Sequence, residues 1–167
     1  VLVFHALTGS PDAAGDWWAR VVGAGRPLDT DRWAVLAPNL LGSCYGTTGP
    51  SDRPDEPFPQ VTPRDQARFA SLLVEALGVR EVALVTGGSL GGMVALEWAA
   101  LSPRRTHATV VLAAPAAHTA HAIAWNAVQR ECLTAAGDAG VALARQISMI
   151  AFRTERTLKL DPKSGHI

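Results

Sequence analysis

Glycines surround one serine of the chain, in the run Gly87-Gly88-Ser89-Leu90-Gly91-Gly92, which contains the pattern G-x-S-x-G. The run directly follows an apolar stretch, Glu81–Thr86, that predicts a strand, and it directly precedes a predicted helix, Leu90–Leu101. A serine at such a turn lies at a helix N-terminus, where N–H groups and a partial positive charge gather. This arrangement is typical of a nucleophile in acyl-group chemistry, with the backbone N–H of Leu90 placed to stabilise an oxyanion.

Two other interpretations of the run are a glycine-rich turn with an incidental serine and a phosphate-binding loop. A phosphate loop of the dinucleotide-binding type would follow the first strand and would have an acidic residue about 20 positions later. Here the run follows the third predicted strand, and no acidic residue stands at a suitable strand end. The strand–turn–helix context therefore favours the nucleophile elbow that α/β-hydrolases use.

A second group of candidate residues, His5-Ala6-Leu7-Thr8-Gly9, follows the first apolar run, Val1–Phe4. In an α/β-hydrolase the loop after this strand supplies the other oxyanion N–H. Position alone leaves the N–H of Leu7 open as that second donor. For His5 itself, a packed histidine at a strand end is favoured over a catalytic base.

The remaining elements predict an α/β fold. Near-continuous apolar strands that alternate with helices indicate a mostly parallel sheet with helices on both faces. The predicted strands are Val1–Phe4, Trp33–Ala37, Glu81–Thr86 and Thr109–Ala114, and the predicted helices are Trp17–Val22, the segment from Thr62-Pro63 to Gly78, Leu90–Leu101, Thr119–Ala136 and Val141–Phe152. In the second of these helices Thr62 is the predicted N-cap, and the apolar stripe comprises Phe69, Leu72, Leu73, Ala76 and Leu77.

Between the second strand and this helix lies a long stretch, Asn39–Pro63, rich in Gly, Pro, Ser and Thr. Irregular loops of that length are uncommon in compact domains and are often functional. No interior linker is visible, so we expect one domain over residues 1–167. The chain begins at Val1 inside an apolar run and ends at Ile167 without a closing element, which favours a partial, truncated domain.

Composition excludes several function classes. The 167 residues include 15 Lys or Arg and 15 Asp or Glu, and 48% are hydrophobic. This balance argues against a nucleic-acid partner, and no apolar run approaches the ~18 residues of a membrane span. Cys44 and Cys132 form no C-x-x-C pair, which favours a reducing, cytoplasmic setting. The five histidines and two cysteines show no metal-ligand spacing, so we expect no metal.

The sequence resembles the homoserine O-acetyltransferases, which are acyltransferases of the α/β-hydrolase fold in methionine biosynthesis. The resemblance runs in order through nearly the whole chain, and the Asn39–Pro50 loop is far more specific than G-x-S-x-G. The blocks that carry it are His5–Gly9, Trp17-Trp18, Gly23–Thr30, Asn39–Pro50 (Asn-Leu-Leu-Gly-Ser-Cys-Tyr-Gly-Thr-Thr-Gly-Pro), Gly87–Met93, Leu96–Ala99, Ile123–Asn126, Gln129-Arg130 and Leu143–Arg145.

The resemblance implies a set of roles. Ser89 would take the acetyl group from acetyl-CoA, a co-substrate, with no bound cofactor, and the N–H groups of Leu7 and Leu90 would form the oxyanion hole. Arg145 would bind the carboxylate of L-homoserine, because a guanidinium can clamp a carboxylate bidentately. Arg130 is expected to be structural. The resemblance also suggests a homodimer, with a helical lid at about 116–152 as the contact.

The chain departs from the family pattern in its triad. α/β-Hydrolases deliver the acid and the base after the serine, on late strand-end loops, and the strands that should carry them are missing here. His166, in Ser164-Gly165-His166, matches only two residues of the family's Gly-His-Asp motif, and it is expected to be a loop residue, as is Asp161. Phe152 stands where the family often has Tyr, and the insert before Arg145 is short.

Several functions remain open at this point. The first is acetyl transfer to L-homoserine; the second is transfer of succinyl, or transfer to L-serine, on the same scaffold. The third is ester hydrolysis, against which the Gly-Thr-Thr-Gly-Pro loop argues. The fourth is a non-catalytic fragment, because a serine without its base is a poor nucleophile.

Overall fold

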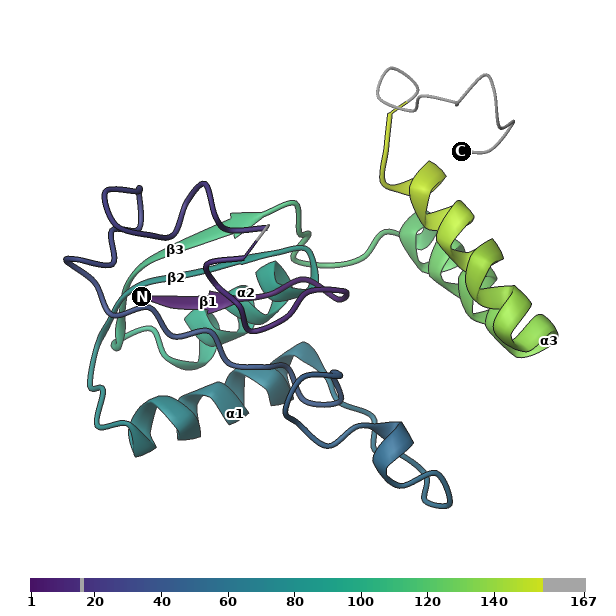
Figure 1. Cartoon of the computed structure of the whole chain (residues 1–167), viewed down its shortest axis with the longest axis horizontal. Helices are drawn as coiled ribbons and strands as arrows, with labels where there is room; N and C mark the ends of the chain where they lie inside the picture. The colour runs from purple at the N-terminus through teal and green to yellow at the C-terminus, as the bar shows by residue number, and fades with distance from the viewer. Residues whose placement is uncertain (16, 155–167) are drawn as a thin grey trace. The chain divides into compact units, whose positions relative to one another are not determined.

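The computed structural model describes residues 1–15 and 17–154, and the chain divides into two compact units, Val1–Ala116 and Ala117–Ile167. The first unit contains a parallel sheet in the order β1-β2-β3, with β1 at Leu2–Phe4, β2 at Val82–Gly88 and β3 at Thr106–Leu112 (Figure 1). The predicted α/β fold with a parallel sheet is confirmed.

The register of the sheet brings the carboxyl ends of its strands to one edge. Phe4 pairs with Gly87, and Gly88 pairs with Leu112. Because all three strands run in the same direction, the loop after β1, the turn after β2 and the turn after β3 emerge side by side. Ligand sites of open parallel sheets form at this edge.

The predicted strand Trp33–Ala37 is wrong as a regular strand. The segment runs beside β1, where the Val3 N–H donates to the Leu36 carbonyl and the Leu36 N–H donates to the Val1 carbonyl, but only one isolated parallel bridge forms, between Leu2 and Leu36. A turn at Asp29–Trp33 precedes the segment and Pro38 follows it. Too few residues remain between them to extend the ladder.

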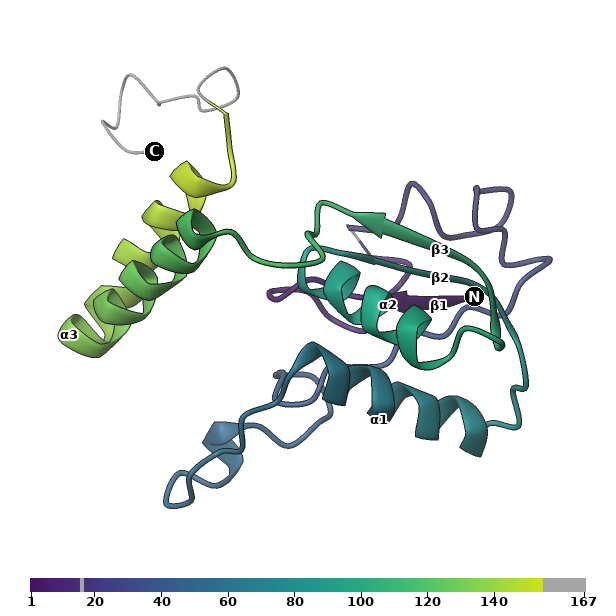
Figure 2. The same cartoon turned by 180° about the vertical axis from the view of Figure 1, so that it is seen from behind.

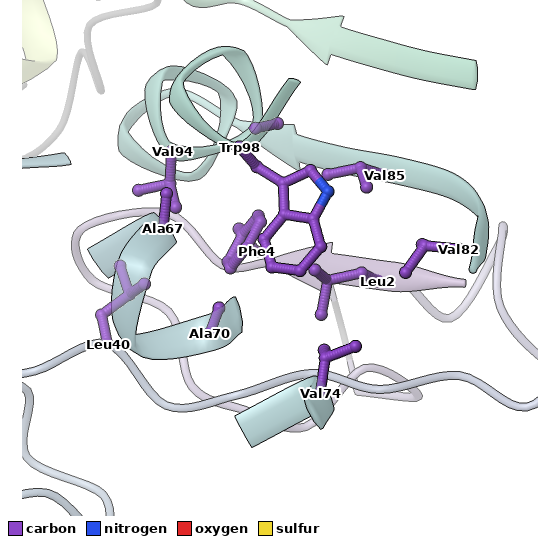
Figure 3. Close-up of a cluster of buried hydrophobic side chains, with 11 residues drawn as sticks. Leu2, Phe4, Leu40, Ala67, Ala70, Val74, Val82, Val85, Val94 and Trp98 are labelled. Atoms are coloured by element: carbon purple, nitrogen blue, oxygen red, sulfur yellow. The ribbon is translucent and has the colours of Figure 1, made fainter. Parts of the chain in front are cut away.

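Two helices cover one face of the sheet (Figure 2): α1 at Pro63–Ala76 and α2 at Leu90–Leu101. Figure 3 shows the core between them, in which the indole of Trp98 from α2 lies beside Phe4 of β1. The two rings lie 6.4 Å apart, and both side chains are fully buried. The other members of this core are Leu2, Leu40, Ala67, Ala70, Val74, Val82, Val85, Val94 and Ala95.

The opposite face of β1 is covered by loop rather than by helix among the described residues. Val3 points into a second core with Trp18 and Val22. The predicted helix Trp17–Val22 is therefore wrong: the segment forms successive turns, in which the Val22 N–H donates to the Trp18 carbonyl at 2.8 Å. These turns bury the Trp18 indole against Val3 of the sheet, and a continuous helix is not needed for that contact.

Helix α1 begins and ends as predicted, but it buries a different face. The Thr62 hydroxyl accepts from the Asp65 N–H and caps the helix, and the Asp65 carboxylate accepts from the Thr62 N–H. The buried positions are Gln66, Ala67, Ala70 and Val74, whereas Leu72 and Leu77 of the expected apolar stripe are more than half exposed. The small alanines let α1 approach its neighbours closely. A hydrophobicity pattern alone does not reveal which helix positions require a small residue.

The second unit, in its described part, is a pair of helical arms assigned to one element, α3, at Ala120–Ala151 (Figure 1). The backbone breaks at Gly137, which has φ 50° and ψ −126°. The Ser148 hydroxyl donates to the Gln129 side-chain oxygen at 2.6 Å, and Gly140 lies so close to the Cys132 carbonyl that no side chain would fit. The expected pair of helices joined by a turn in the region of Gly137 and Gly140 is therefore confirmed. That these helices form a lid stays a prediction.

No helix within residues 1–15 and 17–154 combines the length and the apolar character that crossing a bilayer requires.

Candidate active site

Ser89 occupies a backbone conformation that L residues rarely adopt, with φ 54° and ψ −118°. Its N–H donates to the Leu112 carbonyl of β3 at 2.9 Å, and its carbonyl accepts from the Met93 N–H at 3.1 Å as α2 begins. Its hydroxyl does not cap the helix, and the side chain is exposed. The strained turn therefore holds the backbone in place from both sides and leaves the hydroxyl available for chemistry.

The glycines of the run are required by close packing. A Cβ on Gly87 would overlap the Gly91 carbonyl, and a Cβ on Gly91 would overlap the Phe4 carbonyl. A Cβ on Gly92 would lie 2.6 Å from that of Ala114. The start of α2 therefore packs directly on the ends of β1 and β3, and the backbone groups around Ser89 have little freedom to move.

The two predicted oxyanion donors lie on adjoining turns at this edge. Leu90 is the first residue of α2, and Leu7 lies in the loop after β1, two residues beyond the His5 carbonyl that borders Gly91. Among the described residues neither the Leu7 N–H nor the Leu90 N–H has a hydrogen-bond partner. The structure thus brings Leu7, Ser89 and Leu90 to one edge, with both N–H groups uncommitted.

His5 is a structural histidine, as the sequence favoured. Its side chain is buried, and its Nε2 accepts from the Leu40 N–H at 3.1 Å. Because Nε2 accepts, the neutral ring must carry its proton on Nδ1, which lies 2.8 Å from the Ala6 carbonyl and donates to it. Both ring nitrogens are occupied in joining the loop after β1 to the long loop, so His5 has no nitrogen left for catalysis.

The start of the long loop Asn39–Pro63 is held by side chains, with one short 3-10 turn at Pro50–Asp52. The Gln66 amide of α1 spans Leu41: it accepts from the Leu41 N–H at 2.8 Å and donates to its carbonyl at 3.0 Å. The Thr47 hydroxyl accepts from the Asn39 amide at 2.9 Å and donates to the Leu40 carbonyl at 2.8 Å. These bonds fix residues 39–47 beside His5, at the edge that carries Ser89.

Three further features of this edge were missed from the sequence. Trp17 places its indole against Gly88, with Cζ3 at 2.9 Å from where a Cβ of Gly88 would stand. Ala113, just after β3, is strained like Ser89, with φ 49°. A cavity of about 340 Å³ opens among the loop after β1, Asp12, Trp17 and Tyr45. The Trp17-Trp18 pair beside a glycine-containing loop was the only sequence signal for the cavity.

Arg145 belongs to the second unit, where its side chain is exposed on α3. Neither Arg145 nor Arg130 forms an ion pair with another described residue. Within the described ranges no group of three His, Cys, Asp or Glu side chains could hold a metal ion. His166 and Asp161 lie outside the described residues.

The family of the chain follows from comparison with known proteins. A family model for the alpha/beta hydrolase fold matches residues 1–165. The chain belongs to the α/β-hydrolase fold family. The strained serine between strand and helix is the feature of this family that the structure displays most directly.

Within that family the sequence is similar to curated homoserine O-acetyltransferases. The protein of that name from Clavibacter michiganensis subsp. michiganensis (strain NCPPB 382) is 42% identical over 92% of this chain and 48% of its own length. The one from Thermobifida fusca (strain YX) is 41% identical over 92% of the chain and 48% of its own length. The resemblance inferred from the motifs is confirmed, and the chain spans about half the length of the curated relatives it matches.

Solved structures of two kinds share the fold. Esterase E22 superposes with a TM-score of 0.80 at 25% identity, covering 89% of this chain and 50% of the esterase. The homoserine O-acetyltransferase from Staphylococcus aureus superposes with a TM-score of 0.73 at 30% identity, covering 87% of this chain and 46% of that protein. The scaffold therefore occurs with both transferase and esterase names.

Proposed function

We propose that the protein containing this chain is an acyltransferase that moves an acetyl group from acetyl-CoA to the side-chain hydroxyl of L-homoserine through an acetyl-Ser89 intermediate. One observation carries the proposal: the strained Ser89 turn occurs in a chain that is 42% identical, over 92% of its length, to a homoserine O-acetyltransferase. We propose that this reaction serves methionine biosynthesis in a cytoplasmic setting.

The first half-reaction acylates the serine. A general base removes the proton of the Ser89 hydroxyl as the oxygen attacks the thioester carbonyl, the carbon–sulfur bond breaks, and CoA leaves as its thiol after taking up that proton. The negative charge that develops on the carbonyl oxygen is met by the N–H groups of Leu7 and Leu90, which are uncommitted among the described residues.

The base is proposed to come from outside the described residues. In the first unit, His5 uses both ring nitrogens, and His107 lies at the amino end of β3, the opposite edge from Ser89, where it contacts Glu81. Neither is placed to take a proton from the Ser89 hydroxyl. An acid and a base on later loops would complete the order that this fold uses.

The second half-reaction transfers the acetyl group. The L-homoserine hydroxyl attacks the acetyl-enzyme, loses its proton to the base, and the ester bond to Ser89 breaks as that oxygen is reprotonated. We propose that Arg145 binds the substrate carboxylate. Its support is an exposed guanidinium without an ion pair to any other described residue, since a bidentate carboxylate contact requires uncommitted N–H donors. A homodimer formed through the α3 helices is part of the proposal.

Ester hydrolysis is the second candidate, because esterase E22 superposes on the chain with a TM-score of 0.80. Both functions share the acyl-Ser89 intermediate and differ only in what removes the acyl group. A transferase must keep water from the acyl-enzyme, whereas an esterase must admit it.

The test is intact-protein mass spectrometry of the complete gene product after a short pulse of acetyl-CoA, with Ser89→Ala as the control. We expect one acetyl group on the wild type and none on the variant. Added L-homoserine should discharge the acetyl group as O-acetylhomoserine, whereas discharge by water at the same rate without L-homoserine would establish the esterase. Absence of any acetyl adduct on the wild type would overturn the acyl-enzyme route.

A further inference from the structure

The Trp17 indole is a wall of the Ser89 turn. Gly88 precedes the serine directly, and Trp17 Cζ3 lies where a side chain on Gly88 would otherwise extend. Trp17 is 63% exposed and is not part of the buried core, which is unusual for so large an apolar side chain. The ring therefore borders the residue that directly precedes the nucleophile, and it also lines the neighbouring cavity.

The ring is held in this position by its neighbour. Trp18 is 4% exposed and packs in the second core with Val3, and its ring lies 6.4 Å from that of Trp17. The Trp18 N–H donates to the Gly15 carbonyl at 2.9 Å and closes the turn that carries both indoles. Trp18 thus anchors the turn, and Trp17 is presented at the edge of the sheet.

The cavity beside this wall is about 340 Å³, and its lining includes Ala6 and Thr8, on either side of Leu7, together with Trp17 and Asp12. Among the described residues, Asp12 is the only acidic side chain that lines the cavity, and no lysine or arginine lines it. The Asp12 carboxylate is fixed by accepting from the Ala14 N–H at 3.0 Å. A second negative charge in this cavity would be repelled.

We propose that this cavity is the acyl pocket and that Trp17 and Asp12 restrict the donor to short, uncharged acyl groups, Trp17 by its bulk and Asp12 by its charge. The inference rests on the proposed acyl-Ser89 intermediate and decides between the acetyl and succinyl donors that the sequence left open. The carbonyl oxygen of the acyl group points to the Leu7 N–H, so the acyl chain extends along the indole. A four-carbon chain meets the ring, and a terminal carboxylate meets Asp12 as well.

The experiment separates size from charge with three donors on the complete gene product: acetyl-CoA, butyryl-CoA and succinyl-CoA. Butyryl and succinyl both have four carbons and differ in the terminal carboxylate. Acylation rates of Ser89 are followed by mass spectrometry for Trp17→Leu and Asp12→Asn. The matched controls are Trp33→Leu, at an exposed tryptophan near the amino end of β1, and Asp31→Asn, at an exposed aspartate outside the cavity.

We expect the wild type to prefer acetyl over butyryl by about 100-fold, the discrimination that a few methylenes provide. Trp17→Leu should raise the butyryl-to-acetyl ratio about 10-fold, and Trp33→Leu should leave it unchanged. Asp12→Asn should raise the succinyl-to-butyryl ratio about fivefold, as expected for one partly solvated charge, with no change for Asp31→Asn. Unchanged ratios in both cavity variants would overturn the inference.

The same variants are compared with p-nitrophenyl acetate and butyrate, so that the pocket is tested apart from the CoA donor. If acetyl-CoA leaves no adduct while the chain-length preference for these esters still depends on Trp17, the acyl pocket stands and the proposed transferase fails. If acetyl-CoA acylates Ser89 and no preference depends on Trp17, the transferase stands and the pocket assignment fails. If Trp17→Leu lowers the melting temperature strongly, Trp17→Phe replaces it, with a smaller shift in the same direction expected.

Discussion

Two turns in different parts of the molecule adopt nearly the same backbone conformation with different residues. At the turn into α2, Ser89 has φ 54° and ψ −118°; at the break in α3, Gly137 has φ 50° and ψ −126°. Glycine adopts this region without steric cost, whereas a residue with a Cβ pays about 1–3 kcal/mol. One turn therefore uses the residue that the conformation suits, and the other keeps a residue that it strains.

The difference indicates what each turn is for. Beyond the adjacent backbone, no atom of the described residues lies within 4 Å of the place where a Cβ on Gly137 would stand, so the described hairpin has room for a side chain there but gains nothing from one. At Ser89 the surrounding glycines have no room for side chains, yet a hydroxyl is kept at the one position that points outward. The strain at Ser89 therefore supports the proposed role of its hydroxyl independently of any sequence relative.

Substitution of Ser89 by glycine separates its proposed chemical role from the strain of its backbone. Ser89→Gly should abolish acylation, lowering kcat on the order of 10⁶-fold, as loss of a nucleophile does. It should also raise the free energy of unfolding by about 1 kcal/mol, because strain relief exceeds the greater entropy of glycine in the unfolded chain. Chemical denaturation and the acetyl-CoA pulse on the same samples measure both.

Ser89→Ala is the control, since it removes the hydroxyl and keeps the strained Cβ. It should match Ser89→Gly in lost activity without the gain in stability. A glycine variant that is less stable than wild type would show that the serine is not strained in the folded protein, and the contrast with Gly137 would then carry no functional meaning.

The second prediction concerns the packing that imposes the strain. Gly91→Ala would place a methyl group on the Phe4 and His5 carbonyls, which are backbone atoms and cannot swing aside. Overpacking of this kind should cost about 3 kcal/mol of unfolding free energy. Urea denaturation measures it, with Ala95→Gly, in the buried middle of α2, as a comparison that removes rather than adds a methyl group. A stable Gly91→Ala variant would mean that the turn can relax and that its conformation is not imposed by β1.

Gly137→Ala tests the hairpin with the same added methyl group but in open space. Only the backbone conformation resists it there, so we expect a loss of about 2 kcal/mol, smaller than at Gly91. Thermal unfolding followed by far-UV circular dichroism measures the loss. If Gly137→Ala cost as much as Gly91→Ala, close packing would not be what distinguishes the two turns.

Sequence predicted the elements that local chemistry specifies. The Thr62 cap with Pro63, the helix Leu90–Leu101 and the Ser89 turn were all found, because capping residues, proline and glycine act on their immediate neighbours. The irregular course of Trp33–Ala37 was missed, since a strand needs a partner in register and not only apolar residues.

Long-range packing explains the other differences. The prediction of the buried face of α1 was wrong because it relied on large apolar residues. Ala67 and Ala70 are buried because their small size permits close packing against another helix. Trp17 and Trp18 are adjacent residues of the same type, yet Trp18 is buried and Trp17 lies exposed against Gly88. Which of two adjacent indoles turns outward depends on packing against the sheet beneath them, and the local residue pattern does not reveal it.

Ser89 also differs from the residues that precede the other two helices. Thr62 and Thr119 cap their helices in the ordinary manner, each accepting from a backbone N–H of the first turn, whereas the Ser89 hydroxyl accepts from none. Loss of a working cap costs about 1 kcal/mol. Thr62→Ala should therefore lower stability by about that amount, while Ser89→Ala removes a hydroxyl at a helix start at no capping cost.

The Thr62 cap also predicts a pH dependence that the Ser89 turn lacks. Hydrogen bonds from the Thr62 hydroxyl, and then from its N–H, lower the pKa of Asp65 below its ordinary value of 3.8. A lowered pKa in the folded state stabilises the fold above the ordinary value, and this stabilisation is lost as the pH falls through the folded-state pKa. The melting temperature of Asp65→Asn should thus lie below that of wild type at about pH 6 and approach it at about pH 3. A difference in melting temperature that persists in acid would contradict this prediction and assign the effect to hydrogen-bond geometry. The asparagine oxygen can still accept from the Thr62 N–H, but the asparagine side chain has no carboxyl proton to titrate.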